Sequence, residues 1–460
     1  MKIALIGDGI QSLFLALKLS NQKKNSNITI FSKDHKTSGS LSSGAMLNSF
    51  GEIEYRNFKN YHFKKLLSIY MRATLKWRKY IKLFNYNKKN DLFFEKTGTY
   101  IYVDKSQGEL EKKNFQSILD TLKKKKSKYH FVDKKEFVFL KNKNLSNKLL
   151  FIENEKFLDS NQLYYCLKNF LIKKKIKFVK KNVSKIDEKK KILMVNNKKL
   201  TFDKIVLSCG SDFKKIINKK ISKKIIKQFH GFGYSLDIMS DHKMLKKNKH
   251  CIRSVNRGHA CGIYIIPRTN GTMRIGATNQ IWDKKKFNKN KKTYLELINN
   301  FKKTFPGIDF KIKNINFGFR PVSLDGFPII GKLYKDIYVI SGFGRAGWHC
   351  APDVSDYIFD LMFDKNYSKY NEYKHFSPYR KPIENKKLIK NLIDSEFSAY
   401  IQHISKDLAA IDKKIIKNKI KKKILNVLDF HKLDNVFDNQ IFPYLNYRKK
   451  INKKFSIYEI

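Results

Sequence analysis

The first twenty residues, MKIALIGDGIQSLFLALKLS, constrain the fold more than any other part of the chain. The run KIALIG is apolar without alternation and ends at glycine, which is typical of a strand buried on both faces of a parallel sheet. The following IQSLFLALKLSNQ has apolar residues at helical spacing, and NITIFS has the pattern of a second strand. The segment therefore predicts a βαβ unit at the start of an α/β fold.

A glycine-rich turn joins the predicted strand to the predicted helix. Gly7, Gly9 and Ser12 form the pattern GxGxxS, and Ile10 begins the helix. In a dinucleotide-binding turn the first glycine permits the tight turn, the second lets the backbone approach a pyrophosphate, and a small third residue allows close packing. The free amides at the helix N-terminus would then face the phosphates. Taken alone, the pattern fits FAD, NAD or an ordinary tight turn.

The end of the second predicted strand departs from the usual dinucleotide-binding pattern. An acidic residue is expected there to bond a ribose hydroxyl. Ser32 occupies this place instead, and Lys33 and Asp34 follow it. Either Ser32 makes a weaker bond to the ribose, or Asp34 reaches the same position.

The size and charge of the chain bound its class. A length of 460 residues predicts two or three domains with a sizeable core. The 97 lysines and arginines against 40 acids give a formal net charge of +57, a balance found in proteins that bind polyanions. The lysines are scattered in short runs along the whole chain, so we interpret most of the charge as compositional bias. A nucleic acid partner is kept as the less favoured alternative.

The cysteines and the hydropathy of the chain indicate the cellular compartment in which the protein is expected. The five cysteines form no CxxC pair and are odd in number, which fits neither a zinc cluster nor a disulfide framework, and we expect no metal site. The N-terminus lacks a secretory signal pattern, and no apolar run approaches the roughly 18 residues of a membrane span. We therefore expect a cytoplasmic protein without a transmembrane segment.

The rest of the chain alternates between helical and strand patterns. Apolar spacing predicts a helix from about residue 56 to 90, and the alternation in GTYIYVD predicts strands of a second domain. Asp159 or Ser160 caps a further helix, after which a series of strands leads to IVLSCGS. The stretch around Thr269-Asn270-Gly271 reads as a β-hairpin. Beyond about residue 366 the chain is rich in lysine, lacks glycine and has a helical pattern.

Five further motifs follow the N-terminal turn in order. They are SLSSGAMLNSFGE (40–52), IVLSCGS (205–211), YIIPRTNGTMRIGATN (264–279), GFRPVSLDGFPIIG (318–331) and GFGRAGWHCAP (342–352). Taken together they resemble the flavoprotein family of D-amino acid oxidase and glycine oxidase, the DAO family. The resemblance spans residues 1 to about 365 and does not cover the last part of the chain.

The resemblance implies an α/β fold in which a Rossmann-like FAD-binding domain carries an inserted α+β substrate domain built on a β-sheet, plus a C-terminal helical extension. The expected FAD-binding domain is discontinuous and comprises residues 1–90, 156–228 and 316–365. The expected substrate domain comprises residues 91–155 and 229–315. The Lys-rich extension comprises residues 366–460.

The resemblance also implies which residues bind FAD. Besides the Gly7–Ser12 turn with Ser32 and Lys33, the matching residues are Ser42, Ser43, Gly44, Ala45 and Met46 beside the pyrophosphate, ribityl chain and flavin ring, Val183 at the adenine, Cys209 and Gly210 in a small-residue turn, and Gly342, Gly344, Arg345 and Gly347 at the flavin pyrimidine edge. His349 and Cys350 lie near this loop, but neither matches the position of a covalent flavin linkage. We expect noncovalent FAD.

The residues expected around the substrate are Arg320, Tyr264, Arg345 and Asn279. Arg320 matches the family arginine that pairs with the substrate carboxylate, and a planar guanidinium can hold a carboxylate bidentately. Tyr264 matches a tyrosine that assists this carboxylate, while Arg345 and Asn279 match positions that line the same pocket. The alternatives are a structural ion pair for Arg320, a half-buried strand aromatic for Tyr264 and a plain turn residue for Asn279.

Two further residues have competing interpretations. Arg274 lies near the place where some relatives hold a cation that activates oxygen, although an outward-facing arginine is the commoner role on a basic protein. Asp325 in LDGFP is better interpreted as a turn residue that bonds its own backbone than as a catalytic base.

The predicted function is FAD-dependent oxidation of a small-molecule amine or amino acid. The substrate carboxylate is clamped, a hydride leaves the α-carbon for the flavin, and the imine hydrolyses in water. Two alternatives remain, namely the same flavin chemistry on a modified nucleoside of transfer RNA and a non-enzymatic nucleic-acid-binding protein. Lysines clustered around the pocket mouth would favour the first of these alternatives.

Overall fold

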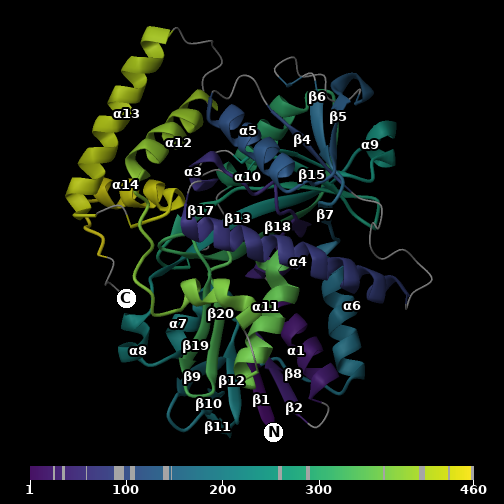
Figure 1. Cartoon of the computed structure of the whole chain (residues 1–460), viewed down its shortest axis with the longest axis vertical. Helices are drawn as coiled ribbons and strands as arrows, with labels where there is room; N and C mark the ends of the chain where they lie inside the picture. The colour runs from purple at the N-terminus through teal and green to yellow at the C-terminus, as the bar shows by residue number, and fades with distance from the viewer. Residues whose placement is uncertain are drawn as a thin grey trace.

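The structure is a computed structural model of the whole chain (Figure 1). It describes residues 1–460 apart from 24–25, 34–36, 59, 87–97, 104–108, 138–144, 147, 257–261, 286–290, 366–367, 403–409, 434–435 and 457–460.

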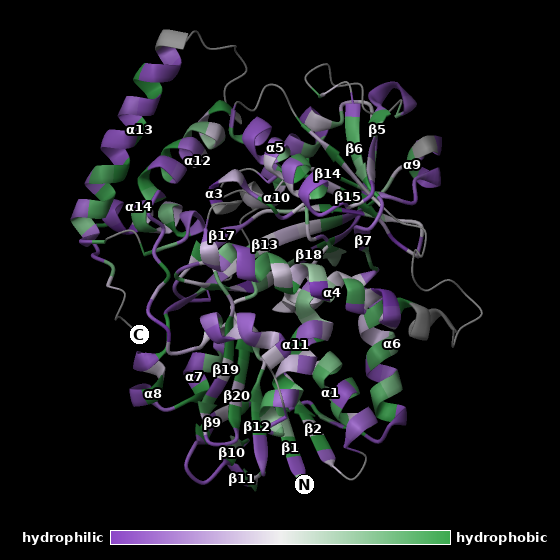
Figure 2. Ribbon diagram, viewed as in Figure 1, coloured by the Kyte–Doolittle hydropathy of each residue, from purple (hydrophilic) through white to green (hydrophobic). Residues whose placement is uncertain are grey.

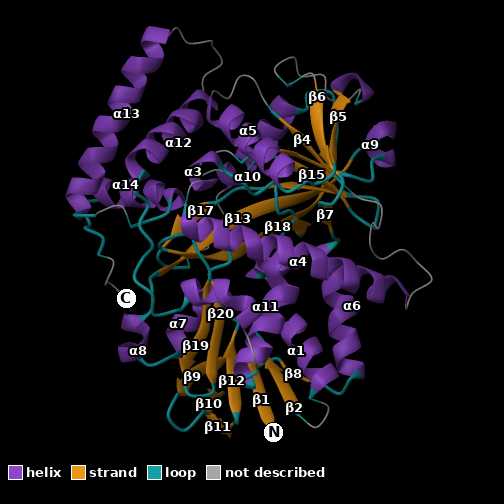
Figure 3. Ribbon diagram, viewed as in Figure 1, coloured by secondary structure: helices purple, strands orange, loops and turns teal. Residues whose placement is uncertain are grey.

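The N-terminal segment forms the centre of a six-stranded sheet in the order β19-β20-β12-β1-β2-β8. The strands are β1 (Lys2–Ile6), β2 (Asn27–Phe31), β8 (Lys177–Val179), β12 (Lys204–Leu207), β19 (Ile329–Tyr334) and β20 (Ile337–Ser341). All neighbours pair in parallel except β19 and β20. This lower sheet in Figure 3 confirms the predicted βαβ unit, with α1 (Ile10–Gln22) between β1 and β2.

The unbroken apolar run of β1 is explained by burial on both faces of this sheet. Ile3 and Leu5 belong to a core covered by α1, α4 (Tyr61–Tyr86), α6 (Ser160–Lys173) and α11 (Gly347–Met362). Ala4 and Ile6 point to a second core on the opposite face. A small sheet of β9 (Val183–Asp187), β10 (Ile192–Val195) and β11 (Lys198–Thr201) contributes to that second core, together with α7 (Phe213–Ile216). The green strands flanked by helices in Figure 2 show this double burial.

The helix predicted from about residue 56 to 90 is divided into two. A short α3 (Tyr55–Phe58) precedes α4, and Asn60 accepts a hydrogen bond from the Phe63 amide at 3.0 Å before α4 begins. An asparagine at this place caps the helix and satisfies one of its free amides. The last predicted helical residues, 87–90, lie outside the described part. The cap of α6 is Asp159, one of the two residues predicted for this role.

The second sheet has nine strands and lies above the first in Figure 3. Its order is β17-β13-β16-β15-β14-β4-β6-β5, and β18 pairs with the free side of β13. The strands are β4 (Thr99–Tyr102), β5 (Tyr129–Asp133), β6 (Lys148–Ile152), β13 (Gln228–Met239), β14 (Cys251–Ser254), β15 (Tyr264–Pro267), β16 (Met273–Gly276), β17 (Gln280–Trp282) and β18 (Lys311–Ser323). The predicted hairpin is confirmed, because β15 and β16 pair antiparallel around the Thr269-Asn270-Gly271 turn.

Helices cover the second sheet, and one strand crosses a predicted boundary. Apolar side chains of α10 (Lys291–Thr304) and α5 (Glu109–Lys124) pack on its strands in two separate cores. β18 pairs with β13 from Lys311 to Ser323 without leaving the sheet. The predicted boundary between residues 315 and 316 therefore falls inside β18. The sequence around residue 315 contains no turn signal that would mark a domain boundary there.

The segment after residue 366 is helical, as predicted, and it packs against the body of the protein. It contains η5 (Ser368–Phe376), α12 (Leu388–Gln402), α13 (Ala410–His431), η6 (Asn439–Ile441) and α14 (Phe442–Lys450), the green-to-yellow elements of Figure 1. Leu388, Ile424, Phe442 and Leu445 are buried in the second core of the six-stranded sheet. The C-terminal extension is therefore part of the folded unit.

Two features of the described residues concern the cysteines and the question of a membrane span. Cys166, Cys209, Cys251 and Cys350 are free thiols, whereas Cys261 lies outside the described part. Among the helices that the structure describes, none combines the length and the apolar character that crossing a bilayer requires.

Candidate active site

A long cavity begins at the carboxyl ends of β1, β2 and β12 and continues to the face of the nine-stranded sheet. The carboxyl edge of a parallel sheet is the usual ligand site of such folds. The cavity is lined by the turn after β1, the segment 37–46, the turn after β12, residues of β15 and β18, and the loop that opens α11. These segments are occupied by the N-terminal glycine turn and by the five motifs that follow it in the sequence.

The two glycines of the GxGxxS turn line the cavity, and Ser12 lies behind it. Gly7 has φ +103°, and a Cβ on it would lie 2.6 Å from the Ser208 carbonyl oxygen. The Ser12 hydroxyl donates to the Gly7 carbonyl and is hydrogen-bonded to the Ser208 hydroxyl. The turn after β1 is therefore pressed against the end of β12, and Ser12 holds α1 to it as a small packing residue.

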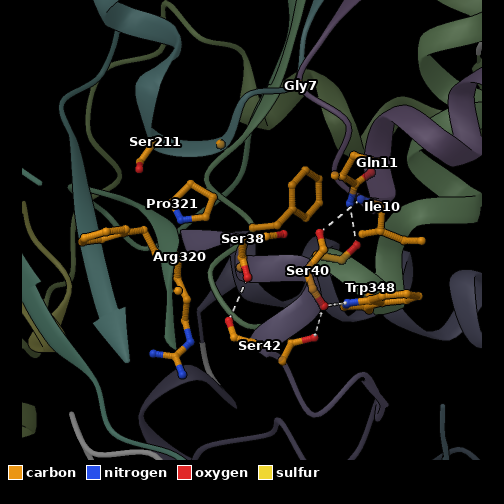
Figure 4. A pocket seen from close by; sticks show the side chains of 18 of the residues that line it. Gly7, Ile10, Gln11, Ser38, Ser40, Ser42, Ser211, Arg320, Pro321 and Trp348 are labelled. Atoms are coloured by element: carbon orange, nitrogen blue, oxygen red, sulfur yellow. Dashed lines mark hydrogen bonds between the residues drawn. The ribbon is translucent and has the colours of Figure 1, made fainter. Parts of the chain in front are cut away.

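The N-terminus of α1 opens into the cavity beside a short serine-rich helix, α2 (Gly39–Ser42). The Ile10 amide donates to Ser40 Oγ at 3.1 Å, and the Ser40 carbonyl accepts from Trp348 Nε1 at 2.9 Å (Figure 4). The first turn of α1 carries no acidic residue, and the Gly9 N-cap has no side chain to fill the space. Free amides at the positive end of a helix dipole fit a pyrophosphate group.

The end of the cavity beside β2 holds the residues expected at the ribose and adenine. Ser32, Lys33, Val183, Cys209 and Gly210 all line it. Ser32 follows β2 and is buried, and its hydroxyl is a polar group that the end of this strand presents to the cavity. Asp34, the alternative ribose partner, lies outside the described residues. Sequence reasoning did not identify Lys181, which belongs to no recognisable pattern, or Ser211, which ends the motif IVLSCGS but was given no role.

The segment expected beside the flavin lies against the nine-stranded sheet. Ser42, Ser43, Gly44, Ala45 and Met46 line the cavity. A Cβ on Gly44 would lie 2.8 Å from Ile266 Cδ1 and 3.1 Å from the Tyr264 ring, so only glycine lets the chain approach β15 this closely. Ala45 follows with φ +48°, which turns the chain back toward the cavity.

The loop before α11 is divided between two cavities. Gly344, Arg345 and Gly347 line the long cavity, as expected for the flavin edge. Gly342 does not, because its φ of +72° directs the chain toward Ile329, and it lines a second, adjoining cavity. The role of Gly342 at the cofactor stays a prediction, since it lines the adjoining cavity together with Gly344 and Arg345.

Arg320 on β18 is a cation without an acidic partner among the described residues. Its Nη1 donates to the Thr278 carbonyl at 3.0 Å and to Asn279 Oδ1 at 3.2 Å. The Nε and Nη2 atoms make no hydrogen bond to any described residue, so one edge of the guanidinium is available to a ligand. Tyr264, 6% exposed, lines the same cavity. The expected carboxylate clamp and its expected tyrosine therefore face one space.

Arg345 differs from Arg320 because acids surround it. Its Nη2 lies 3.2 Å from Glu52 Oε2 and 3.4 Å from Glu54 Oε1. Glu52 also pairs with Arg253 Nη1 at 2.9 Å. Burial raises the pKa of Glu52, but the charges of Arg345 and Arg253 outweigh it and leave the pKa lowered. Glu52 and Arg253 line the cavity and were not assigned from the sequence, where they stand 201 residues apart.

Asn279 is not among the residues that line either cavity. Its Oδ1 accepts from Arg320 Nη1, and its Nδ2 donates to Gln440 Oε1 at 2.9 Å. Both ends of the Asn279 amide are therefore used within the protein, one by Arg320 and one by Gln440, and its place in the substrate pocket stays a prediction. Asn279 is not a plain turn residue.

Arg274 has neither of the roles considered for it. It is fully buried and forms a bidentate pair with Asp237, at 2.8 and 3.0 Å. Its Nη1 donates to the carbonyls of Leu41 and Ser43 at 2.8 and 2.9 Å. Arg274 does not line the cavity and instead fixes the serine-rich segment to the nine-stranded sheet.

Asp325 acts as the predicted turn residue and also binds the extension. It accepts from the Phe327 amide at 3.2 Å, two residues along the chain. Its two oxygens also accept from Arg380 at 2.8 and 2.9 Å. Both oxygens of the Asp325 carboxylate are therefore occupied by hydrogen bonds within the protein.

A buried carboxyl group supports the loop that carries Glu52. Glu155 Oε1 accepts from the amides of Phe50 and Gly51 at 2.6 and 2.8 Å. Burial raises the pKa of Glu155 to about 7, although these two amides and Arg253 act in the opposite direction. Glu155 therefore carries a proton in the folded protein at pH values where the unfolded chain has lost it.

Glu155→Gln is expected to flatten the pH dependence of stability. A carboxyl whose pKa is raised from 4.5 to about 7 contributes stability that is full below about pH 4.5 and is lost as the pH rises through 7. The loss amounts to at most about 3 kcal/mol. Glutamine keeps the Oε1 acceptor and does not titrate. Urea unfolding of both proteins at pH 5, 6, 7 and 8 measures the difference, and parallel curves would contradict this origin.

Comparison with known proteins agrees with this geometry. The family model described as FAD dependent oxidoreductase, DAO, matches residues 2–361. Iminodiacetate oxidase from Chelativorans sp. BNC1 superposes with a TM-score of 0.67 at 14% identity, covering 82% of this chain and 98% of that one. Glycine oxidase from Bacillus cereus ATCC 14579 gives 0.66 at 17% identity, with 83% and 99% covered. L-proline dehydrogenase from P. horikoshii gives 0.64 at 17%, with 82% and 97% covered.

The structural likenesses, all below 25% identity, establish the fold. The family match covers most of the chain and includes every motif that lines the long cavity. The glycine turn, the free helix N-terminus and the close approach at Gly44 fit the cofactor that the family name implies. The chain therefore belongs to the DAO family of FAD-dependent oxidoreductases.

Proposed function

We propose that this chain oxidises a small amine that carries a carboxylate, such as an α-amino acid or an N-substituted one. The observation that carries the proposal is Arg320, a guanidinium without an acidic partner among the described residues, in the cavity that the cofactor segments line. The three structural relatives are named for iminodiacetate, glycine and L-proline, each of which combines an amine with a carboxylate.

The residues of this chain would position the substrate and hold its charge. Arg320 presents its free edge to the carboxylate, which fixes the carbon that bears the amine. Tyr264 lies in the same cavity and supplies a hydroxyl to the carboxylate. Arg345 lies beside Glu52 and Glu54, which also pair with Arg253 and Arg56, so part of its charge is already engaged within the protein. When bound, FAD would supply the hydride acceptor, and water would hydrolyse the imine product.

We further propose that FAD is held without a covalent bond. Cys350 is fully buried in the core and does not line the cavity. His349 does line it, but its Nε2 is hydrogen-bonded to Thr74 Oγ1 at 2.8 Å. Burial raises the pKa of the Cys209 thiol to about 12, which leaves it in the unreactive protonated form. We expect acid precipitation of the holoprotein to leave all the flavin in the supernatant; yellow colour in the washed pellet would contradict this.

The proposed reaction is tested by anaerobic mixing of the yellow protein with a panel of substrates. The panel contains D-amino acids, glycine, N-methylated amino acids, L-proline and iminodiacetate. At least one member should bleach the visible flavin absorbance, and esterification of its carboxylate should abolish the bleaching. A protein that holds flavin but is bleached by no carboxylate substrate would overturn the proposed function.

The surroundings of the second cavity favour a small molecule over a nucleic acid at this end of the site. This cavity adjoins the first at Arg320 and Arg345 and is lined by Glu52, Glu54, Asp325, Glu384 and Asp438. None of its lining residues is a lysine. The lysines that line the long cavity, Lys33, Lys181 and Lys285, do not line the second cavity. Among the described residues, lysines are therefore not gathered in the wall of the second cavity, as they would be around a transfer RNA substrate.

A further inference from the structure

The C-terminal extension follows the segment that the family model matches, which ends at residue 361. It packs directly on the strands beside Arg320. Trp282 of β17 contacts the rings of Tyr444 and Tyr447 at centroid distances of 6.4 and 5.3 Å. Phe229 of β13 contacts Tyr444 and Phe455 at 5.7 and 5.8 Å. Burial of Phe229, Tyr444 and Phe455 in these contacts fixes the extension against the substrate side of the protein.

One side chain of the extension is connected to the proposed carboxylate clamp. Gln440 lies in η6. Its backbone N–H donates to Asp438 Oδ1 at 2.9 Å, and the backbone N–H of Asp438 donates to the Leu324 carbonyl at 2.7 Å. The Gln440 side chain accepts from Asn279 Nδ2 at 2.9 Å. Asn279 in turn accepts from Arg320 Nη1 at 3.2 Å. The residues Gln440, Asn279 and Arg320 therefore form a hydrogen-bonded chain from the extension into the site.

The direction of each bond matters. An asparagine amide has a donor end and an acceptor end, and a guanidinium can use only the acceptor. Gln440 Oε1 accepts the hydrogen bond from Asn279 Nδ2. This orients the Asn279 side chain so that its Oδ1 faces Arg320 Nη1. With Nη1 held by Asn279 and the Thr278 carbonyl, the guanidinium keeps Nε and Nη2 for a ligand. A partner that orients a binding residue in this way acts on affinity without touching the ligand.

We propose that Gln440 is a positioning residue and that the C-terminal extension is thereby an integral part of the substrate site. The inference rests on the proposed role of Arg320 as the carboxylate clamp. The extension also supplies Phe437, Asp438 and Gln440 to the wall of the second cavity, where Arg320 is exposed to the same space. Substrate binding thus depends on a part of the chain that is far from the flavin segments in sequence.

The test compares full-length variants in their flavin-loaded form. Gln440→Leu removes the acceptor, and Gln440→Glu keeps an oxygen at the same place. Asn426→Leu is the matched control, because Asn426 is an exposed amide of the same extension whose side chain is bonded to Lys449 and, among the described residues, to no residue of either cavity. The probe is acetate or propionate, titrated while the visible flavin spectrum is recorded. Flavin content and thermal midpoint are measured in parallel.

Gln440→Leu should weaken binding of the carboxylate probes about three- to tenfold, the effect of one hydrogen bond in such a network. It should raise KM more than it lowers kcat and should leave flavin content unchanged. Gln440→Glu and Asn426→Leu should bind the probes like the wild type. Equal probe affinity in Gln440→Leu and wild type, or a lower thermal midpoint with unchanged affinity, would overturn the positioning role alone. A wild type that binds flavin but no carboxylate would overturn the proposed function and this inference together.

Discussion

Arg320→Ala is expected to lower kcat/KM for a carboxylate substrate by roughly thirtyfold or more while FAD stays bound. The substrate carboxylate would then enter a desolvated site without its partner, and loss of one member of such a charge pair costs about 2 to 5 kcal/mol. FAD should be retained because the turn after β1, the N-terminus of α1 and the serine-rich segment do not depend on Arg320. Steady-state kinetics with the best substrate of the panel, together with the flavin-to-protein ratio, measure both effects.

Two further variants distinguish a specific interaction of the Arg320 guanidinium with the carboxylate from a general effect of positive charge on the protein. Arg320→Lys keeps a cation but loses the planar fork, so it should recover only part of the loss. Arg78→Ala removes an exposed arginine that is bonded to Asn154 outside the site, and its kinetics should match the wild type. If Arg320→Ala left the affinity for carboxylate substrates and probes unchanged, Arg320 would have no place in substrate binding.

The features that were predictable from sequence are those whose cause is local. Within the run KIALIG, residues 3–6 are all apolar because both faces of β1 are buried, and this pattern is visible in the sequence alone. The identities of Gly7, Gly9 and Ser12 follow from the tight turn that joins β1 to α1. The hairpin at Thr269-Asn270-Gly271 likewise follows from its own turn residues.

The features that were missed depend on partners far along the chain. Arg274 stands in a recognisable motif, but its role is decided by Asp237 and by the carbonyls of Leu41 and Ser43. Asn279 matches a pocket position, yet Gln440 of the extension, 161 residues away, turns it into a support for Arg320. Hydrogen-bond partners brought together by tertiary packing leave no periodic pattern, so a single sequence cannot reveal them.

The boundary inside β18 has the same kind of cause. β13 and β18 pair along nearly their whole length, from Gln228 with Ser323 to Met239 with Lys311. The part of β18 that carries Arg320 is thus continuous with strands of the substrate-side sheet, although the motif GFRP belongs to the matched flavoprotein pattern. A boundary drawn from motif order alone divides this strand, whereas the hydrogen-bond ladder that unites it appears only in the folded structure.

The two glycines of the N-terminal turn are expected to fail in different ways when each is replaced by alanine. A Cβ on Gly7 would lie 2.6 to 2.8 Å from backbone atoms of Ser208 and Cys209, and φ +103° is itself strained for alanine. Strain and overpacking each cost about 1 to 3 kcal/mol. Gly7→Ala should therefore destabilise even the flavin-free protein by about 3 kcal/mol or more.

Gly9→Ala should instead leave the flavin-free fold within about 1 kcal/mol of the wild type and weaken FAD binding. Gly9 has φ −66°, and the nearest atom to an added Cβ is Ser40 Oγ at 3.2 Å, the end of a short side chain. The added methyl group would occupy the space at the N-terminus of α1 into which a pyrophosphate must come. Urea unfolding of the apoproteins combined with FAD titration distinguishes the two variants. Equal destabilisation by both substitutions, or full FAD affinity in Gly9→Ala, would show that the close approach at this turn is not made by the cofactor.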